Sequence, residues 1–150
     1  RLADQLHAGD YGNYILSIGR LESVKRVDLV IRAMTHVPAH LRLVIAGTGT
    51  ERASFERLAS ELGLTSRVDF LGEVDDRRAI DLFAGALAVI YPPFDEDYGY
   101  VTLEAFLSHK PVITTTDSGE PTAFVIDGVN GAVTDAIVSV APFTSSTPVQ

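Results

Sequence analysis

The chain alternates between short runs of apolar residues and longer stretches in which apolar residues recur at helical spacing. The first run, residues 13–18, is continuous enough to be a strand that is buried on both faces. From Val27 to Met34, apolar residues then follow at i, i+3, i+4 and i+7, which predicts a helix with one buried face. Similar pairs of strand and helix follow as far as residue 134.

The complete pattern predicts six strands and five helices. The strands are expected at 13–18, 41–46, 68–71, 87–91, 111–115 and 131–134. The helices are expected at 27–34, 55–62, from Asp75 or Asp76 through Ala84, from Gly99 or Tyr100 through Ser108, and at 121–126. Strands that alternate with helices of these lengths form right-handed βαβ units around a parallel sheet. We therefore predict an α/β fold, a Rossmann-like doubly wound parallel sheet with helices on both faces.

A length of 150 residues fits one domain with one main core. We expect residues 1–12 to be a lead-in segment, residues 13–134 to be the patterned domain and residues 135–150 to be an irregular, truncated tail. Because the chain begins at Arg1, we also expect it to be a piece of a longer protein.

Composition excludes several functions. Twelve Lys and Arg against 20 Asp and Glu give a formal charge of −8, and no basic run offers a face for nucleic acid. The absence of cysteine excludes disulfides and thiolate metal sites, and the four scattered histidines have no metal-ligand spacing. No apolar run approaches the length of a membrane span, and no signal peptide opens the chain.

The loops that follow the strands are the places to look for a site, because ligands of open parallel sheets lie beyond the carboxyl ends of the strands. The loop 19–26 brings Gly19, Arg20 and Lys25 close to one strand end and one helix start. Glycine allows the backbone to approach a ligand, and two cations at a helix N-terminus suit a diphosphate. The alternative is a solvated basic turn.

The loop after the fourth predicted strand is acidic, with carboxylates at 95–97. Glu96 lies eight positions before Glu104, which stands on a mostly apolar helix where a carboxylate needs hydroxyl donors. At the start of that helix, Gly99 leaves the N–H groups of Tyr100 and Val101 to face an anion or a sugar. The alternative is a helix-capping acid with one exposed glutamate.

Two further loops carry weaker signals. The polar segment 114–121 either cradles a phosphate or only turns the chain. The loop 47–49, Gly-Thr-Gly, lacks the third glycine and the acidic residue of a dinucleotide-binding fingerprint, so we do not assign it that function.

Taken in order, several segments resemble the C-terminal donor-binding domain of retaining glycosyltransferases with the two-domain GT-B fold, known as family 4 or group 1. The matching segments are 18–21 with Lys25 and Arg26, 43–47, 68–72, the Glu96-x7-Glu104 spacing with Ala105, 111–114, and Asp127-Gly128 with Asn130-Gly131. The resemblance covers residues 13–134, and the ordered set is more specific than any single segment.

The resemblance implies a role for each matched residue. Arg20 and Lys25 would hold the diphosphate of a nucleotide sugar and stabilise the charge on the leaving nucleotide. Glu96 would contact the hydroxyls of the donor sugar, and Glu104 would accept hydrogen bonds from the ribose hydroxyls. The expected catalytic residues are Glu96, Arg20 and Lys25; the expected donor-binding residues are Gly19, Arg20, Lys25, Gly72, Val74, Glu96, Tyr98, Gly99, Tyr100, Val101 and Glu104.

The resemblance also implies the partners. The substrate would be a nucleotide-diphosphate sugar, with no metal or other cofactor, because two cations and a helix N-terminus replace a divalent ion. The acceptor site would lie on a missing N-terminal domain, so this chain alone should bind the donor weakly and transfer nothing. We expect a cytoplasmic protein, peripheral at the inner membrane face only through the absent half.

Two positions depart from the family pattern: Glu120 stands where the family commonly has glycine, and Ala123 where it has glutamate. A carboxylate at Glu120 that points inward would repel a diphosphate. The leading interpretation is the donor-binding half of a hexosyltransferase. The alternatives are a non-catalytic nucleotide-sugar or phosphate-binding module and a flavodoxin-like interaction domain.

Overall fold

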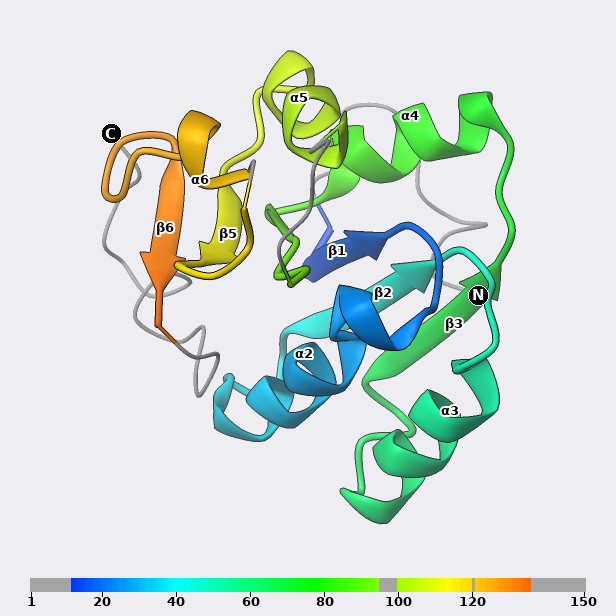
Figure 1. The fold of residues 1–150 in the computed structure, drawn as a ribbon. Coiled ribbons are helices and arrows are strands. Elements are labelled where there is room, and N and C mark those ends of the chain that lie inside the picture. The colour runs from blue at the N-terminus through cyan, green and yellow to red at the C-terminus, as the bar shows by residue number, and fades with distance from the viewer. Residues whose placement is uncertain (1–11, 95–99, 120, 136–150) are drawn as a thin grey trace.

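The computed structural model describes residues 12–94, 100–119 and 121–135 as a six-stranded parallel sheet with helices on both faces (Figure 1). In chain order the elements are β1 Tyr14–Ile18, the 3-10 turn η1 Ser23–Lys25, α2 Val27–Ala33, the 3-10 turn η2 Met34–His36, β2 Arg42–Ala46, α3 Arg52–Glu61, β3 Val68–Gly72, α4 Asp76–Gly85, β4 Ala88–Ile90, α5 Tyr100–Leu107, β5 Val112–Thr115, α6 Pro121–Phe124 and β6 Gly131–Thr134. The predicted lead-in and tail lie almost entirely outside the described residues.

The strand order β3-β2-β1-β4-β5-β6 is that of a doubly wound Rossmann sheet, which confirms the predicted fold class. Every strand pair is parallel, and each predicted strand and helix is present within a few residues of its expected position. The first predicted helix, 27–34, is present as α2, and its last turn continues as the 3-10 turn η2. Arg26, with φ +55°, separates α2 from the 3-10 turn η1 before it.

The strands carry side chains into two cores. Ile15, Leu43 and Ile45 point to the face covered by α2 and α3, whereas Leu16 and Val44 point to the face covered by α4 and α5. Both faces of β1 and β2 are therefore buried, which explains why their sequences are mostly apolar and do not alternate with polar residues.

Local signals fix several element ends. Asp75 caps α4 by accepting a hydrogen bond from the backbone N–H of Arg78 at 2.8 Å, which selects Asp75 over Asp76 as the N-cap. Gly63 follows α3 with φ +71°, the left-handed conformation that commonly ends a helix. Within the described residues, no helix is both long and apolar enough to cross a bilayer.

Candidate functional site

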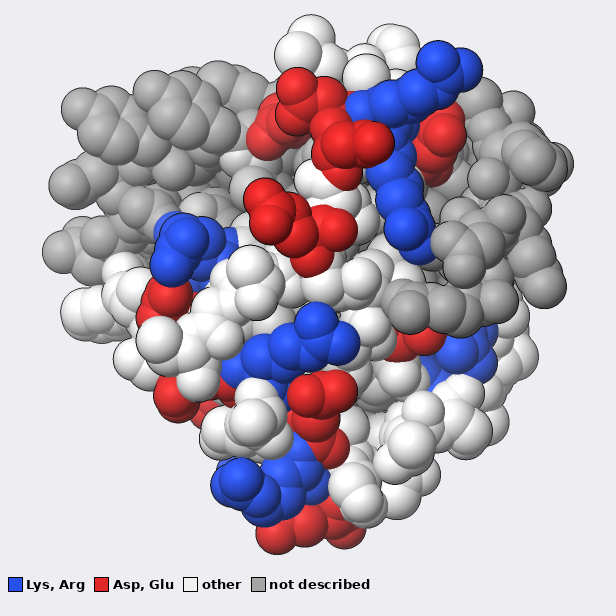
Figure 2. Space-filling model, turned by 90° about the vertical axis from the view of Figure 1, so that its right-hand side faces the viewer, with Lys and Arg blue, Asp and Glu red and all other residues white. Residues whose placement is uncertain are grey.

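The loop that follows β1 forms the centre of the candidate site. Gly19 has φ +145°, and a Cβ atom there would meet no heavy atom within 4 Å, so the backbone is open to an approaching group. Arg20 comes next, with 72% of its side chain exposed. Figure 2 looks onto the end of the molecule toward which β1 and β2 point, and shows acidic and basic side chains interspersed there.

Arg20 is held by an acidic neighbour. Its guanidinium lies 3.1 Å from the carboxylate of Glu22, which also accepts a hydrogen bond from the Thr50 hydroxyl at 2.8 Å. The hydrogen bonds from Thr50 and Arg20 lower the pKa of Glu22, so this carboxylate stays charged. An incoming diphosphate would therefore share Arg20 with a fixed carboxylate or displace it.

Lys25 stands beside Tyr91, a buried residue directly after β4. Its Nζ donates to the Tyr91 hydroxyl at 3.4 Å and lies 5.7 Å from the centre of the Tyr91 ring. Gly19, Arg20, Lys25, Tyr91 and Pro92 all line one crevice at the carboxyl end of β1. The crevice measures about 10 Å³, room for one water molecule at most, so a nucleotide would bind at its mouth.

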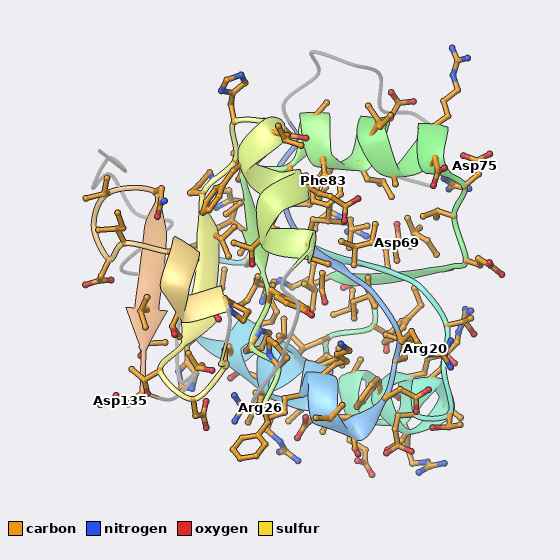
Figure 3. The ribbon with its side chains drawn as sticks, turned by 45° about the horizontal axis from the view of Figure 1, so that its top comes forward. Arg20, Arg26, Asp69, Asp75, Phe83 and Asp135 are labelled. Atoms are coloured by element: carbon orange, nitrogen blue, oxygen red, sulfur yellow. The ribbon has the colours of Figure 1, made fainter. Side chains whose placement is uncertain are left out.

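Arg26, which the sequence analysis did not single out as a site residue, is the most connected side chain of this region. Its guanidinium donates to the carbonyls of Pro92 and Pro93 at 2.8 and 3.1 Å and to the hydroxyl of Thr115 at 2.8 Å. It also forms a bidentate pair with Asp117 at 2.6 and 2.9 Å. In Figure 3, Arg26 lies toward β5 and β6 and Arg20 lies away from them. The sequence alone does not indicate that Lys25 and Arg26, although adjacent, have different partners.

The polar segment 114–118, at the end of β5, is hydrogen-bonded to itself and to neighbouring segments. Thr114 donates to the Tyr91 carbonyl at 2.7 Å and to the Ser118 hydroxyl at 2.8 Å, and Ser118 also bonds the N–H of Thr115. All three side chains are buried. These hydroxyls therefore serve to fold the turn, which favours the turn over the phosphate cradle that the sequence left open.

The Gly-Thr-Gly loop after β2 supports the loop after β1. A Cβ atom on Gly47 would lie 1.8 Å from the Gly19 carbonyl oxygen, and one on Gly49 would lie 2.4 Å from the Leu21 carbonyl oxygen. The N–H of Leu21 donates to the Thr48 carbonyl at 3.0 Å. Glycine is needed here for close backbone packing, which accounts for the motif without a dinucleotide.

Gly72 ends β3 and Val74 follows it, at the edge of the sheet where a base is expected. Gly72 has φ +77°, and its carbonyl accepts the N–H of Gly47 at 2.8 Å. Val74 is half-buried against the core beneath α4 and α5. Both residues thus have structural contacts, and their predicted place along the base stays a prediction.

Glu104 lies on α5 in a different cavity from the two cations. That cavity, of about 270 Å³, lies between α4 and α5 and is lined by Asp76, Ile80, Phe83 and Leu107 as well as Glu104. Partial burial and the nearby charge of Asp76 raise the pKa of Glu104. The predicted contact of Glu104 with the ribose of a nucleotide whose diphosphate is held by Arg20 and Lys25 therefore stays a prediction.

Three predicted site residues, Glu96, Tyr98 and Gly99, lie outside the described residues. Tyr100 begins α5, as predicted, and Val101 is half-buried next to it. The structure also does not describe the side chains of residues 120 and 123, the two positions that depart from the family pattern. The roles assigned to all of these side chains remain predictions.

Comparisons with known proteins place this arrangement in a family. A family model described as glycosyl transferases group 1 matches residues 3–140. The D-inositol 3-phosphate glycosyltransferase of Mycobacterium leprae (strain Br4923) is 37% identical over 127 residues, which cover 81% of this chain and 29% of that protein. The enzyme of that name from Xylanimonas cellulosilytica is 34% identical over 125 residues, with 81% and 30% covered. The chain spans less than a third of these relatives.

Solved structures agree. Anabaena Alr3699/HepE in complex with UDP and glucose has a TM-score of 0.79 at 26% identity, covering 88% of this chain and 37% of that one. WaaG, a glycosyltransferase involved in lipopolysaccharide biosynthesis, has a TM-score of 0.73 at 30% identity, covering 85% and 35%. The chain therefore belongs to the group 1 glycosyltransferase family, and its sheet is a Rossmann-like domain of the GT-B fold.

Proposed function

We propose that this chain is the donor-binding domain of a retaining glycosyltransferase, which moves a hexose from a nucleotide-diphosphate sugar to a hydroxyl acceptor. The observation that carries the proposal is the placement of Gly19, Arg20 and Lys25 around one crevice at the carboxyl end of the central strand. That is where open parallel sheets bind nucleotides. Family membership and the UDP bound in the HepE structure support it.

In this proposal the two cations act on the leaving group. As the bond between the sugar and the diphosphate breaks, negative charge grows on the phosphate oxygens, and Arg20 and Lys25 stabilise it. Arg20 is largely exposed and reaches the mouth of the crevice, whereas Lys25 is held against Tyr91 within it. Glu96 would contact the sugar hydroxyls, and the scheme requires no divalent ion.

The acceptor belongs to the part of the protein outside this chain. We propose that it binds on an N-terminal domain and that the reaction takes place between the two halves, in the cytoplasm. The names of the mycobacterial relatives make D-inositol 3-phosphate the first acceptor to test with a longer form. The chain by itself would bind a donor and transfer nothing.

Calorimetric titration tests the donor site directly. UDP, GDP and their sugars are titrated into the chain and into Arg20→Ala, Lys25→Ala and Glu104→Ala variants. We expect each cation variant to weaken binding of a nucleoside diphosphate by about tenfold, the usual effect of losing a charge-assisted contact. Arg57→Ala is the matched control, because Arg57 is exposed on α3 and lines a different groove.

Two results would reject the donor site: no nucleotide bound by the unchanged chain, or unchanged binding by both cation variants. The Glu104 variant is read separately, by comparing UDP with inorganic pyrophosphate. If the variant loses affinity for UDP but not for pyrophosphate, Glu104 is assigned to the nucleoside. If the variant binds each ligand as tightly as the unchanged chain does, Glu104 is not part of the site.

A second candidate function is a binding module without catalysis. Glu120 and Ala123 favour it, because the family commonly has glycine and glutamate at these positions. A longer form of the protein separates the two functions: donor binding with sugar transfer supports the enzyme, and donor binding alone supports the module. Glu120→Gly is the informative variant, since it restores the common residue.

A further inference from the structure

We propose that Arg26 is a positioning residue for the diphosphate site. It holds Lys25 and the wall formed by Tyr91 and Pro92 in place, without itself contacting the nucleotide. The proposal rests on the function proposed above for Arg20 and Lys25.

The guanidinium of Arg26 joins three loops that are far apart in the sequence. Arg26 belongs to the loop after β1. Its guanidinium donates to the carbonyls of Pro92 and Pro93 after β4, and to the side chains of Thr115 and Asp117 at the end of β5. Only 20% of the Arg26 side chain is exposed, against 72% for Arg20. Arg26 is thus committed to the protein, and Arg20 is the cation that solvent and ligands reach.

The partners of Arg26 are themselves fixed. The Thr115 hydroxyl bonds the Asp117 carboxylate at 2.8 Å and lies 2.7 Å from the Ser118 hydroxyl. The Arg26 guanidinium also lies 5.7 Å from the centre of the Phe94 ring, whose residue donates its N–H to the Val24 carbonyl at 2.9 Å. A planar group with five donors in a rigid fork can satisfy such a set, whereas the ammonium of lysine cannot.

The backbone of Arg26 indicates that its side chain matters. Arg26 adopts φ +55° and ψ +41°, a left-handed conformation that glycine adopts with less strain. Among the described non-glycine residues, His109 alone shares a positive φ. A glycine would serve the chain path at this point, so any advantage of arginine lies in the contacts of its guanidinium.

The consequence for the site follows from neighbouring residues. Lys25 precedes Arg26 directly and contacts Tyr91, which precedes the prolines that Arg26 holds. Without the guanidinium, segment 91–94 would lose its links to the Arg26 side chain and keep the Phe94–Val24 hydrogen bond and the contact of Tyr91 with Lys25. Lys25 and its wall would then move relative to each other, and the contribution of the second phosphate to binding would fall.

The test compares UDP with UMP, because UMP lacks one of the two phosphates that Arg20 and Lys25 are proposed to hold. The Arg26→Gly variant keeps the left-handed backbone and removes the guanidinium. We expect it to lose about tenfold of the preference for UDP over UMP, as Lys25→Ala does, while the affinity for UMP changes less than twofold. General loosening of the fold would instead weaken both ligands alike and overturn the proposal.

Further variants sharpen the test. Asp117→Asn removes the charge that pairs with Arg26 and should lower the preference for UDP over UMP. Its effect should not add to that of Arg26→Gly or to that of Lys25→Ala. Arg26→Lys should restore little, and Arg32→Ala, an exposed arginine on α2, is the matched control. If Lys25→Ala lowers the preference and Arg26→Gly does not, Arg26 has no positioning role. If the unchanged chain does not prefer UDP, the proposed function fails instead.

A measurement without ligand keeps the two failures apart. Amide exchange of Phe94, followed by NMR, reports whether segment 91–94 stays joined to the loop after β1. We expect Arg26→Gly to speed the exchange of this amide at least about tenfold while that of a core amide such as Leu43 is unchanged. An unchanged rate at Phe94 overturns the proposal, whatever the nucleotide titrations show.

Discussion

Replacing Gly47 with alanine should destabilise the domain strongly, because its backbone packs against the loop that carries Arg20. Gly47 has φ +127°, and an added Cβ would lie 1.8 Å from the Gly19 carbonyl oxygen. The backbone conformation alone costs an alanine about 1–3 kcal/mol. Moving the Gly19 backbone aside adds about 1–3 kcal/mol, the usual effect of overpacking. We therefore expect a loss of about 4 kcal/mol, a large part of the roughly 5–15 kcal/mol that stabilises a domain.

Urea unfolding followed by far-UV circular dichroism measures the free energy of unfolding of the unchanged chain and of the variant. Gly63→Ala is the matched control, since Gly63 also has a positive φ, +71°, but nothing lies within 4 Å of an added Cβ. It should cost about 1 kcal/mol from the backbone alone. If Gly47→Ala costs no more than Gly63→Ala, the close approach of the two loops does not matter and the reasoning is wrong.

Three other predictions concern polar contacts. Tyr14→Phe should lower the free energy of unfolding by about 1–2 kcal/mol, because the buried Leu82 carbonyl loses its hydroxyl donor; urea unfolding measures it. Hydrogen bonds from Arg26 lower the pKa of Asp117 to about 2. The stability that the charged Asp117 contributes is therefore present above pH 3.8 and is lost as the pH falls toward 2. Asp117→Asn should remove this pH dependence, which amounts to under about 1 kcal/mol of unfolding free energy because the Asp117 carboxylate is exposed. Unfolding experiments between about pH 4 and about pH 2 measure it, and a constant difference between variant and unchanged chain over this range contradicts the prediction. Glu22→Gln should tighten UDP binding about threefold at low salt, less at high salt, by freeing Arg20 for the anion; calorimetry at two ionic strengths checks it.

The fold was predictable because its signals are local and agree with one another. Residues 14–16 and 43–46 are continuous apolar runs, as expected of strands covered on both faces, and Gly63 and Asp75 stand at helix ends. The alternation of such segments leaves few topologies once right-handed crossovers are required. Composition added exclusions but no architecture.

The site was predictable only in part, because side-chain partners depend on where separate loops meet. Gly19, Arg20 and Lys25 lie around one crevice as expected, since they belong to one loop. Lys25 and Arg26 differ because Lys25 contacts Tyr91 and Arg26 pairs with Asp117, and both partners are more than 60 residues away in the sequence. No periodicity or spacing in the sequence reports such a meeting. The same holds for Glu104, whose neighbour Asp76 comes from a different helix.

The ladder between β1 and β4 is much shorter than the one between β1 and β2. β1 matches five residues of β2 but only two of β4, Ile15 with Ala88 and Leu16 with Val89. The ladder between β4 and β5 is equally short, with two matched pairs, so the sheet is narrowest on both sides of β4. Arg26 joins the segments that follow β1, β4 and β5 beyond this narrow part. Under mechanical load we expect the sheet to open beside β4 first, so that the crevice would come apart while β1, β2 and β3 stayed paired.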